Sequence, residues 1–308
     1  MARCLVVGGN GFLGSYVVDE LVDRGHEVTV FDRFSSPDVA WAAGGVSPIV
    51  GDFMDTAALR QAVDGQHHVF HFLSSTTPAT AEDDPTLDIR TNISQSVELF
   101  KAAAEARVTR VYFASTGGAM YNSHSDHPVS ELALPAPVSP YAIGKQAIEG
   151  YLRYFRQKHG LDSVTFRISN PYGARQRGNR KQGVIPIFLH QVAAGLPIEV
   201  FGDGSMVRDY IYVTDAVHMI AETVERPVLH PLYNIGSGVG TSVAELVDLA
   251  RDITGLPVTV QHRDKLPTAV DTVVLETQRY SAEFGAPSLV SLREGMRRTW
   301  DATLAEST

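Results

Sequence analysis

The sequence predicts an α/β fold with a doubly wound parallel sheet and a second, smaller α/β domain. Three observations support this prediction. Short apolar runs alternate with helical patterns over the first 169 residues, and a glycine-rich turn joins the first run to the first helical pattern. After residue 170 the alternation loosens into glycine-bearing loops. Strands separated by helical segments form parallel sheets that helices cover on both faces.

The expected strands of the first part are short runs rich in apolar and β-branched residues. They cover residues 3–7, 27–31, 47–50, 67–73, 110–115 and 163–169. The helices expected between them cover residues 12–24, 93–106 and 141–159. In the second part we expect a strand at 208–213 and helices near 184–194, 215–225, 242–254 and 291–302.

These elements predict two closely joined domains. Residues 1–169 are expected to form the first, and residues 170–308 the second, with some segments after residue 205 returning to the first. The chain has 308 residues and 44% hydrophobic residues, which is enough for a large core. Open α/β sheets bind ligands beyond the carboxyl ends of their strands, so the second domain is expected to hold the substrate there.

Composition excludes several classes of protein. A net charge of −9 argues against a general nucleic-acid binder, which carries a basic surface. Cys4 is the only cysteine, so intrachain disulfides are impossible and a reducing compartment is expected. No apolar run approaches the roughly 18 residues that span a bilayer. We therefore expect a cytoplasmic protein that binds neither membrane nor nucleic acid.

The glycine-rich turn carries Gly8, Gly11 and Gly14 at three-residue spacing, directly after the first strand. In a Rossmann sheet such glycines let the backbone approach a dinucleotide pyrophosphate at the start of a helix. Asp32 ends the second strand, 18 residues beyond Gly14. Its carboxylate is expected to accept hydrogen bonds from the adenosine ribose and to repel a 2′-phosphate. NAD is therefore preferred to NADP, although the neighbouring Arg33 weakens that preference.

Asp52 ends the third strand in the run "GDF" and has two interpretations. Its carboxylate could reach the adenine amino group, or it could simply cap a turn. The residues alone leave both open.

Tyr141 and Lys145 lie four residues apart in "SPYAIGK". On a helix this spacing places both side chains on one face. An ammonium beside a phenol favours the phenolate and lowers the tyrosine pKa. A tyrosine of lowered pKa is a general base toward a hydroxyl group, so the pair predicts an enzyme.

Further runs extend the pattern over nearly the whole chain. They are "FAST" at 113–116, "RISNPYGARQ" at 167–176, "FGDGSMVRDYIYV" at 201–213 and "YNIGSG" at 233–238. With the glycine motif, Asp32 and the tyrosine–lysine pair, the chain resembles the extended short-chain dehydrogenase/reductase family, and most of all its nucleotide-sugar epimerases, typified by UDP-galactose 4-epimerase. The resemblance implies tightly bound NAD and a UDP-sugar substrate. It also implies that further residues contact the cofactor, namely Phe12, Leu13, Arg33, Phe53, Leu73, Ser74 and Asn92.

The resemblance implies catalytic roles for three residues. Tyr141 would remove the proton of the sugar 4-hydroxyl, and Lys145 would bind the nicotinamide ribose. Thr116 lies 25 residues before Tyr141 and would bridge the substrate hydroxyl and the tyrosine. Ser115 is adjacent and remains an alternative for that bridge.

The run "STGGAMY" departs from the related dehydratases and decarboxylases. Those enzymes carry an acidic residue shortly after the Ser/Thr, whereas here Gly117 and Gly118 follow. Neither glycine offers an acid or a base, so dehydration is disfavoured. We interpret the glycines as room for a sugar that must turn over.

By the same resemblance, the second domain holds the nucleotide. Asn170 and Arg208 would bind the diphosphate, unless Arg208 pairs with its neighbour Asp209. The backbone around Val184 would line the uracil site. Arg263 and Asp271 match the family pattern only loosely. The small Thr268 is expected to leave room for a 2-acetamido group, so that N-acetylated sugars would be accepted.

Two rival functions remain. One is a dehydratase or reductase of the same family, and the other is a non-catalytic NAD-binding regulator. The family also implies a homodimer through the helices at 93–106 and 141–159. No metal site is expected at His67, His68 and His71, because alternate residues of a strand face opposite sides.

Overall fold

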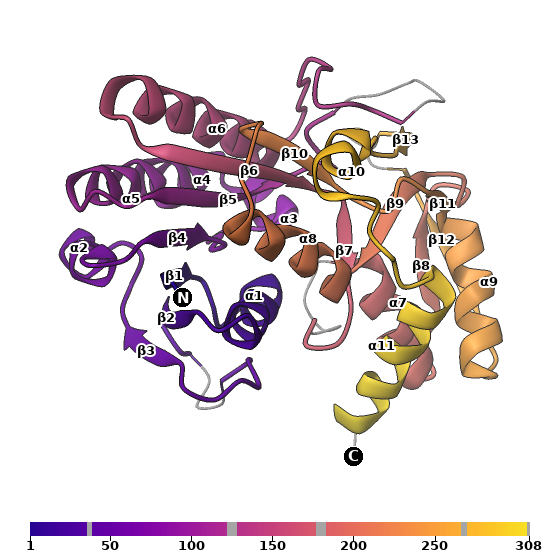
Figure 1. Ribbon diagram of the computed structural model, residues 1–308. Helices are drawn as coiled ribbons and strands as arrows, with labels where there is room; N and C mark the ends of the chain where they lie inside the picture. The colour runs from indigo at the N-terminus through magenta and orange to yellow at the C-terminus, as the bar shows by residue number, and fades with distance from the viewer. Residues whose placement is uncertain (36–38, 122–127, 177–182, 266–269, 307–308) are drawn as a thin grey trace. The chain divides into compact units, whose positions relative to one another are not determined.

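The main sheet of the protein has seven strands in the order β10-β6-β5-β4-β1-β2-β3 (Figure 1). The computed structural model describes residues 1–35, 39–121, 128–176, 183–265 and 270–306. The seven strands are Arg3–Val7 (β1), Glu27–Asp32 (β2), Ser47–Val50 (β3), His68–His71 (β4), Arg110–Thr116 (β5), Asp162–Ile168 (β6) and Leu232–Ile235 (β10). The pairs from β3 through β2, β1 and β4 to β5 are all parallel, which confirms the predicted α/β sheet.

Helices of this sheet are Phe12–Asp23 (α1), Thr56–Val63 (α2), Ser94–Glu105 (α5) and Pro140–His159 (α6). The sequence analysis overlooked α2, and also the two short helices Pro78–Asp83 (α3) and Pro85–Asp88 (α4). A π-helical turn, Ile89–Ile93 (η1), joins α4 to α5. π-Turns are rare and concentrate at functional sites, and this one contains Asn92.

Local signals fix the ends of α6, the helix of the tyrosine–lysine pair. The Ser139 side chain accepts a hydrogen bond from the backbone N–H of Ala142, and Pro140 occupies the first helical position. The helix ends at Gly160, whose φ of 68° suits glycine. Tyr141 therefore stands in the first turn of a well-defined helix.

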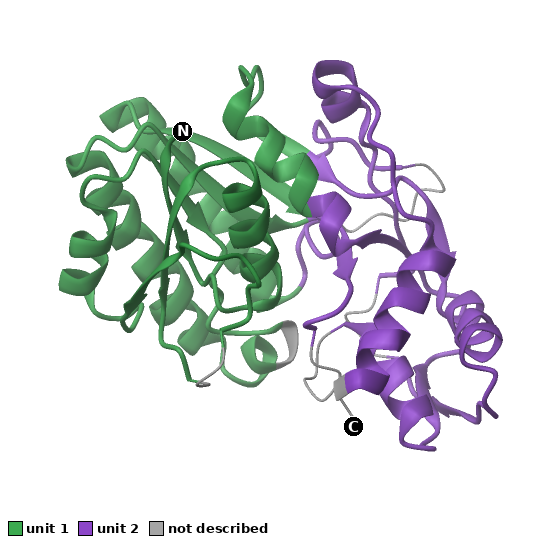
Figure 2. Ribbon diagram, turned by 60° about the horizontal axis from the view of Figure 1, so that its bottom comes forward, with its two compact units in different colours: residues 1–116, 139–167, 217–233 green, residues 117–138, 168–216, 234–308 purple. Residues whose placement is uncertain are grey.

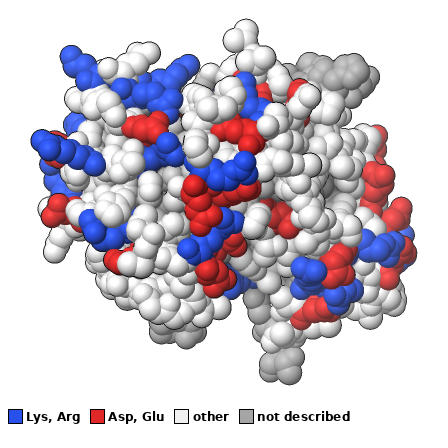
Figure 3. Space-filling model, in the orientation of Figure 1, with Lys and Arg blue, Asp and Glu red and all other residues white. Residues whose placement is uncertain are grey.

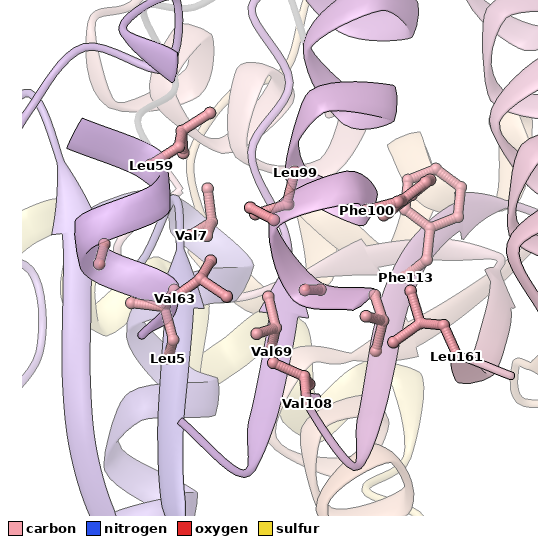
Figure 4. Packing of buried hydrophobic residues seen from close by; sticks show 14 of the residues in the cluster. Leu5, Val7, Leu59, Val63, Val69, Leu99, Phe100, Val108, Phe113 and Leu161 are labelled. Carbon is pink, nitrogen blue, oxygen red and sulfur yellow. The ribbon is translucent and has the colours of Figure 1, made fainter. Parts of the chain in front are cut away.

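One hydrophobic core lies between the sheet and the layer of α2, α5 and α6. Figure 4 shows Leu59 and Val63 of α2 beside Val7 and Leu5 of β1. Phe100 of α5 and Phe113 of β5 belong to the same core, together with buried residues of α6. Each such side chain contributes about 1.5–3 kcal/mol on burial, so the core holds α6 firmly against β5.

The chain divides into two compact units (Figure 2). Unit 1 comprises Met1–Thr116, Ser139–Arg167 and Val217–Tyr233, and unit 2 comprises Gly117–Val138, Ile168–Ala216 and Asn234–Thr308. The segment 117–138 thus groups with unit 2, whereas we expected it in the first domain. Its described part packs there because the backbone of Val129 bonds with Val274 and Glu276, and its side chain packs against Leu275.

Unit 2 combines small sheets with three packed helices. Strand β9 (Val207–Tyr212) pairs with β7 (Asn170–Tyr172), β11 (Gly240–Ser242) and β13 (Thr272–Val273). Strand β8 (Ile198–Phe201) pairs with β12 (Val260–Arg263). The helices of unit 2 are Val184–Ala193 (α7), Val243–Thr254 (α9), Gln278–Phe284 (α10) and Leu292–Glu306 (α11). Helix α8 (Val213–Glu225) begins in unit 2, and its residues from Val217 onward belong to unit 1. A second core joins α7, α9 and α11.

On the face drawn in Figure 3, basic and acidic side chains are interspersed. Within α11, Glu294 pairs with Arg297 and Arg298. Within the described ranges, no helix is both long and apolar enough to cross a membrane.

Candidate active site

The glycine turn has the shape that a dinucleotide phosphate requires. Gly8 has a φ of 87°, and a Cβ there would lie 2.7 Å from the Cα of Leu73. A Cβ on Gly14 would overlap the carbonyl oxygen of Gly8. Gly11 is the N-cap of α1 and provides no side-chain hydrogen bond to the first turn, where Phe12 and Leu13 lie. The first N–H groups of α1 are therefore free to bind an anion.

Asp32 connects the glycine turn to the end of β2. Its Oδ2 accepts a hydrogen bond from the backbone N–H of Asn10 at 3.0 Å, which leaves further lone pairs for a ribose. Arg33, the next residue, is exposed. The arrangement fits the adenosine half of a dinucleotide.

At Asp52 the structure supports the turn interpretation. Asp52 Oδ1 accepts a hydrogen bond from the N–H of Met54 at 2.8 Å. Phe53 is a core residue whose ring lies 5.4 Å from that of His71, so only its backbone can reach a cofactor. Contact of Asp52 with the adenine stays a prediction.

Tyr141 and Lys145 lie together on α6. The ammonium nitrogen of Lys145 is 5.7 Å from the centre of the Tyr141 ring and 4.8 Å from that of Phe113. It donates a hydrogen bond to the carbonyl oxygen of Ala114 at 2.9 Å. Lys145 is buried, so its Nζ is held in one place.

The pKa values of the pair differ from the simple expectation. Burial lowers the pKa of Lys145 to about 8, although the carboxylates of Asp88 and Glu149 oppose this shift. Burial raises the pKa of Tyr141 to about 12, and the negative charge of Asp88 adds to that rise. Desolvation of the phenolate thus outweighs the ammonium of Lys145 in the protein by itself. The resemblance attributes the lowered pKa of Tyr141 to Lys145 together with the cationic nicotinamide, and that stays a prediction.

The two neighbouring hydroxyl residues at the end of β5 have different surroundings. Ser115 is buried and donates a hydrogen bond to Oε1 of Glu149 at 2.6 Å. Thr116 is partly exposed, and its hydroxyl has no hydrogen-bond partner among the described residues. This difference favours Thr116 as the residue that reaches a substrate.

A polar network follows β4. Asn92 Oδ1 accepts a hydrogen bond from the N–H of Ser75 at 2.8 Å, while its amide donates to Asp88 and to Thr76. Ser74 donates to the carbonyl oxygen of Thr76. The predicted cofactor residues Leu73, Ser74 and Asn92 thus come together near the glycine turn, since Leu73 borders Gly8.

The sequence analysis missed the charged residues behind the pair, namely Asp88, Glu149 and Arg167. A signal existed for Glu149, which follows Tyr141 by eight residues and so lies on the same helix face. Arg167 donates to both carboxylate oxygens of Glu149, at 3.1 and 2.8 Å. Asp88 gave no comparable signal, because short helices obscure its position.

In unit 2, Arg208 does not pair with Asp209. Its guanidinium donates to the carbonyl oxygens of Val207, Val270 and Asp271. Asp209 instead accepts hydrogen bonds from Ser237 and from the backbone of neighbouring loops. Within the described ranges no carboxylate forms an ion pair with the guanidinium of Arg208, although the charge of Asp271 acts on it. Its contact with a diphosphate stays a prediction.

Asn170 lies beside Gly118. Its side-chain nitrogen donates to the carbonyl oxygen of Asp209 at 2.9 Å, and a Cβ on Gly118 would lie 3.3 Å from that nitrogen. A side chain at position 118 would therefore crowd Asn170, and glycine avoids this. The interpretation of the two glycines as room for a turning sugar stays a prediction.

The remaining predicted substrate residues of unit 2 are less well supported. Arg263 pairs with Glu199 through two nitrogens, and Asp271 pairs with Lys265. Val184 begins α7 and is half-buried. Thr268 lies outside the described residues. The roles of these residues stay predictions.

Comparison with known proteins decides the family. The model of the family "NAD dependent epimerase/dehydratase family" matches residues 4–236. The chain belongs to this family. Two curated relatives are a UDP-glucose 4-epimerase of Mycolicibacterium smegmatis and a dTDP-4-dehydro-6-deoxyglucose reductase of Escherichia coli. The first is 32% identical and the alignment covers 96% of this chain and 97% of that protein, and for the second these values are 29%, 95% and 94%.

Solved structures agree with this membership. UDP-glucose 4-epimerase of Thermotoga maritima, solved with UDP-glucose, has a TM-score of 0.93 at 32% identity and coverage of 99% and 100%. The UDP-glucose 4-epimerase of Thermus thermophilus, solved with NAD, has a TM-score of 0.91 at 33% sequence identity. The match covers 98% of this chain and 99% of that one. A UDP-N-acetylglucosamine 4-epimerase of Methanobrevibacter ruminantium has 0.92 at 26%, with 99% of both chains covered. The predicted resemblance is confirmed, and the cofactor of the chain is NAD.

Proposed function

We propose that the protein is an NAD-dependent UDP-sugar 4-epimerase that interconverts UDP-glucose and UDP-galactose. The observation that carries the proposal is the hydroxyl of Thr116 at the end of β5, which has no hydrogen-bond partner among the described residues. Tyr141 and Lys145 lie on α6, and the following "GGAM" contains no acid. This set suits removal and return of one hydroxyl proton. It lacks the second acid or base that dehydration needs.

In this proposal Tyr141 takes the proton of the sugar 4-hydroxyl, and Thr116 bridges the two oxygens. Bound NAD supplies a hydride acceptor and donor for C4 and a positive charge that favours the Tyr141 phenolate. Lys145 binds the nicotinamide ribose. The reaction is redox-neutral, because the hydride taken from C4 returns to the opposite face of the same carbon.

Arg208 and Asn170 hold the diphosphate while the sugar turns. Support comes from the guanidinium of Arg208, which contacts only carbonyl oxygens within the described ranges. Such a cation forms strong hydrogen bonds with phosphate oxygens. A firm hold at this point is necessary, since the 4-keto sugar must present its other face.

The rival with a specific observation in its favour is a nucleotide-sugar reductase, because the E. coli relative is one. Incubation with UDP-, dTDP-, GDP- and CDP-sugars, read by NMR, separates the two. An epimerase equilibrates a sugar pair without added NAD(P)H, whereas a reductase consumes the reduced cofactor. The same panel tests UDP-N-acetylglucosamine, and lack of turnover would reject acceptance of acetylated sugars. A non-catalytic regulator would convert nothing.

A homodimer through α5 and α6 is part of the proposal. Large apolar side chains are exposed on α6, namely Ile143, Tyr151 and Tyr154, and Ile89 of η1 is exposed as well. Large apolar side chains that are left exposed on a helix can form part of a protein interface. A dimer mass in light scattering supports the proposal, and a monomer mass rejects it.

A cytoplasmic location is also proposed, because a chain with a single cysteine has no intrachain disulfide and suits a reducing compartment.

A further inference from the structure

The charges of two carboxylates act on the ammonium of Lys145, those of the buried Asp88 and the partly buried Glu149, and they differ in how they are balanced. Glu149 forms a bidentate ion pair with Arg167 and also accepts the Ser115 hydrogen bond. Its negative charge is therefore matched by a cation of its own. Glu149 leaves little net charge for Lys145.

Asp88 has only neutral partners. It is 2% exposed, and its Oδ1 accepts hydrogen bonds from the Thr76 hydroxyl and from the Asn92 amide, the latter at 2.7 Å. No arginine, lysine or histidine lies within ion-pair distance of Asp88 in the described part of the chain. A buried carboxylate is costly without a cation nearby, and Lys145 is a buried cation without a carboxylate of its own.

The backbone of α6 is shaped to admit Asp88. A Cβ on Gly144 would overlap Oδ2 of Asp88. Gly144 lies between Tyr141 and Lys145, so the carboxylate reaches the helix at the pair itself. Glycine inside a helix costs about 1 kcal/mol relative to alanine, and close approach of Asp88 is what it permits here.

We propose that Asp88 is a positioning residue of the reaction: it supplies the counter-charge of Lys145 and orients the Asn92 amide at the cofactor site. The negative charge of Asp88 acts on Tyr141 as well, because Gly144 has no side chain that would keep the carboxylate away from α6. The proposal rests on the proposed function only in assuming that Tyr141 and Lys145 do the chemistry.

The sign of the effect follows from the groups that face the pair. Besides Asp88 of α4, these are the neutral, buried His71 of β4, Glu149 of α6 and Arg167 of β6, the last two paired with each other. A negative charge favours the neutral phenol and the protonated amine. Removal of the charge of Asp88 therefore lowers the pKa of both Tyr141 and Lys145.

Asp88→Asn tests this in the NAD-bound protein without any substrate. The ultraviolet absorbance of tyrosinate is titrated with pH, and the contribution of Tyr141 is obtained by subtracting the same variant with Tyr141→Phe. We expect the midpoint for Tyr141 to fall by about one pH unit, the size typical of a close charge. Asp83→Asn, which removes an exposed carboxylate of α3, should leave it unchanged. If the Tyr141 midpoint were the same in Asp88→Asn as in Asp83→Asn, the proposal would be overturned, whether or not UDP-sugars are converted.

A second variant keeps the test decisive if Asp88→Asn does not fold. Gly144→Ala retains the charge but pushes the carboxylate away from α6. It should move the Tyr141 midpoint in the same direction by a smaller amount, and an unchanged midpoint there would equally refute the role of Asp88. In turnover assays the acidic limb of the kcat/KM profile should move to lower pH together with the midpoint. A purely structural role would lower activity without moving that limb.

Discussion

Ser115 donates its hydroxyl hydrogen to Oε1 of Glu149 at 2.6 Å, so one of two adjacent hydroxyls is committed to the protein interior. The other, that of Thr116, has no partner among the described residues and is partly exposed. This separation predicts different outcomes for two similar substitutions. Thr116→Val should lower kcat by about 100-fold or more, since it removes a proton bridge. Ser115→Ala should lower thermal stability more than kcat, and the reverse pattern would assign the bridge to Ser115.

Arg208 is the proposed contact of the diphosphate, and Arg263 serves as the control for its substitution. Arg208 contacts carbonyl oxygens, whereas Arg263 is neutralised by Glu199. Arg208→Met should raise KM for the nucleotide sugar at least about 10-fold, the loss of a charge-assisted contact. Arg263→Met should change KM little. Steady-state kinetics of both variants checks this, and an equal effect at Arg263 would show that it too contacts phosphate.

Gly14 tests the cofactor turn. A side chain at this position would overlap the carbonyl oxygen of Gly8, so the turn and the start of α1 must move apart. Gly14→Ala should therefore yield a folded protein that has lost most of its bound NAD. The NAD content of the purified protein is the measurement, and Gly44→Ala, where an added Cβ meets nothing within 4 Å, is the control for expression. Full NAD content in Gly14→Ala would contradict the assignment.

His71 predicts a loss of stability in acid. It is buried near the rings of Phe53, Phe100 and Phe113, and burial lowers its pKa to about 3. The unfolded chain binds a proton near pH 6.5, so stability falls as pH drops from there toward 3. At pH 5 the loss should reach about 2 kcal/mol. Denaturant unfolding at pH 7 and pH 5 measures it, and His71→Gln should show a smaller difference. An equal difference would place the acid sensitivity elsewhere.

Much of unit 1 could be predicted because its signals are local. Apolar runs predict β1, β2 and β5, the glycine spacing predicts the start of α1, and Ser139 with Pro140 marks the start of α6. The surroundings of Tyr141 could not be predicted in this way. Its pKa depends on burial and on Asp88, which is 53 residues away in the sequence, and no local pattern records such a contact.

In unit 2 the long helices were predictable and the short strands were not. Strands β7, β11 and β13 have two or three residues each, too few for a hydrophobic period to be recognised. The partners of Arg208 depend on these strands, because Val270 and Asp271, directly before β13, present two of the carbonyl groups that it contacts. Its environment therefore emerges only from the folded unit.

The central claim is a redox-neutral inversion at the sugar C4 by Tyr141. The most direct test follows pure UDP-glucose and pure UDP-galactose separately by NMR with the NAD-bound protein and no added NADH. Both samples should reach the same mixture without a lasting gain in NADH absorbance, and Tyr141→Phe should slow this about 100-fold to 10,000-fold while keeping NAD bound. Failure of both sugars to interconvert, or conversion only with a stoichiometric supply of NADH, would contradict it.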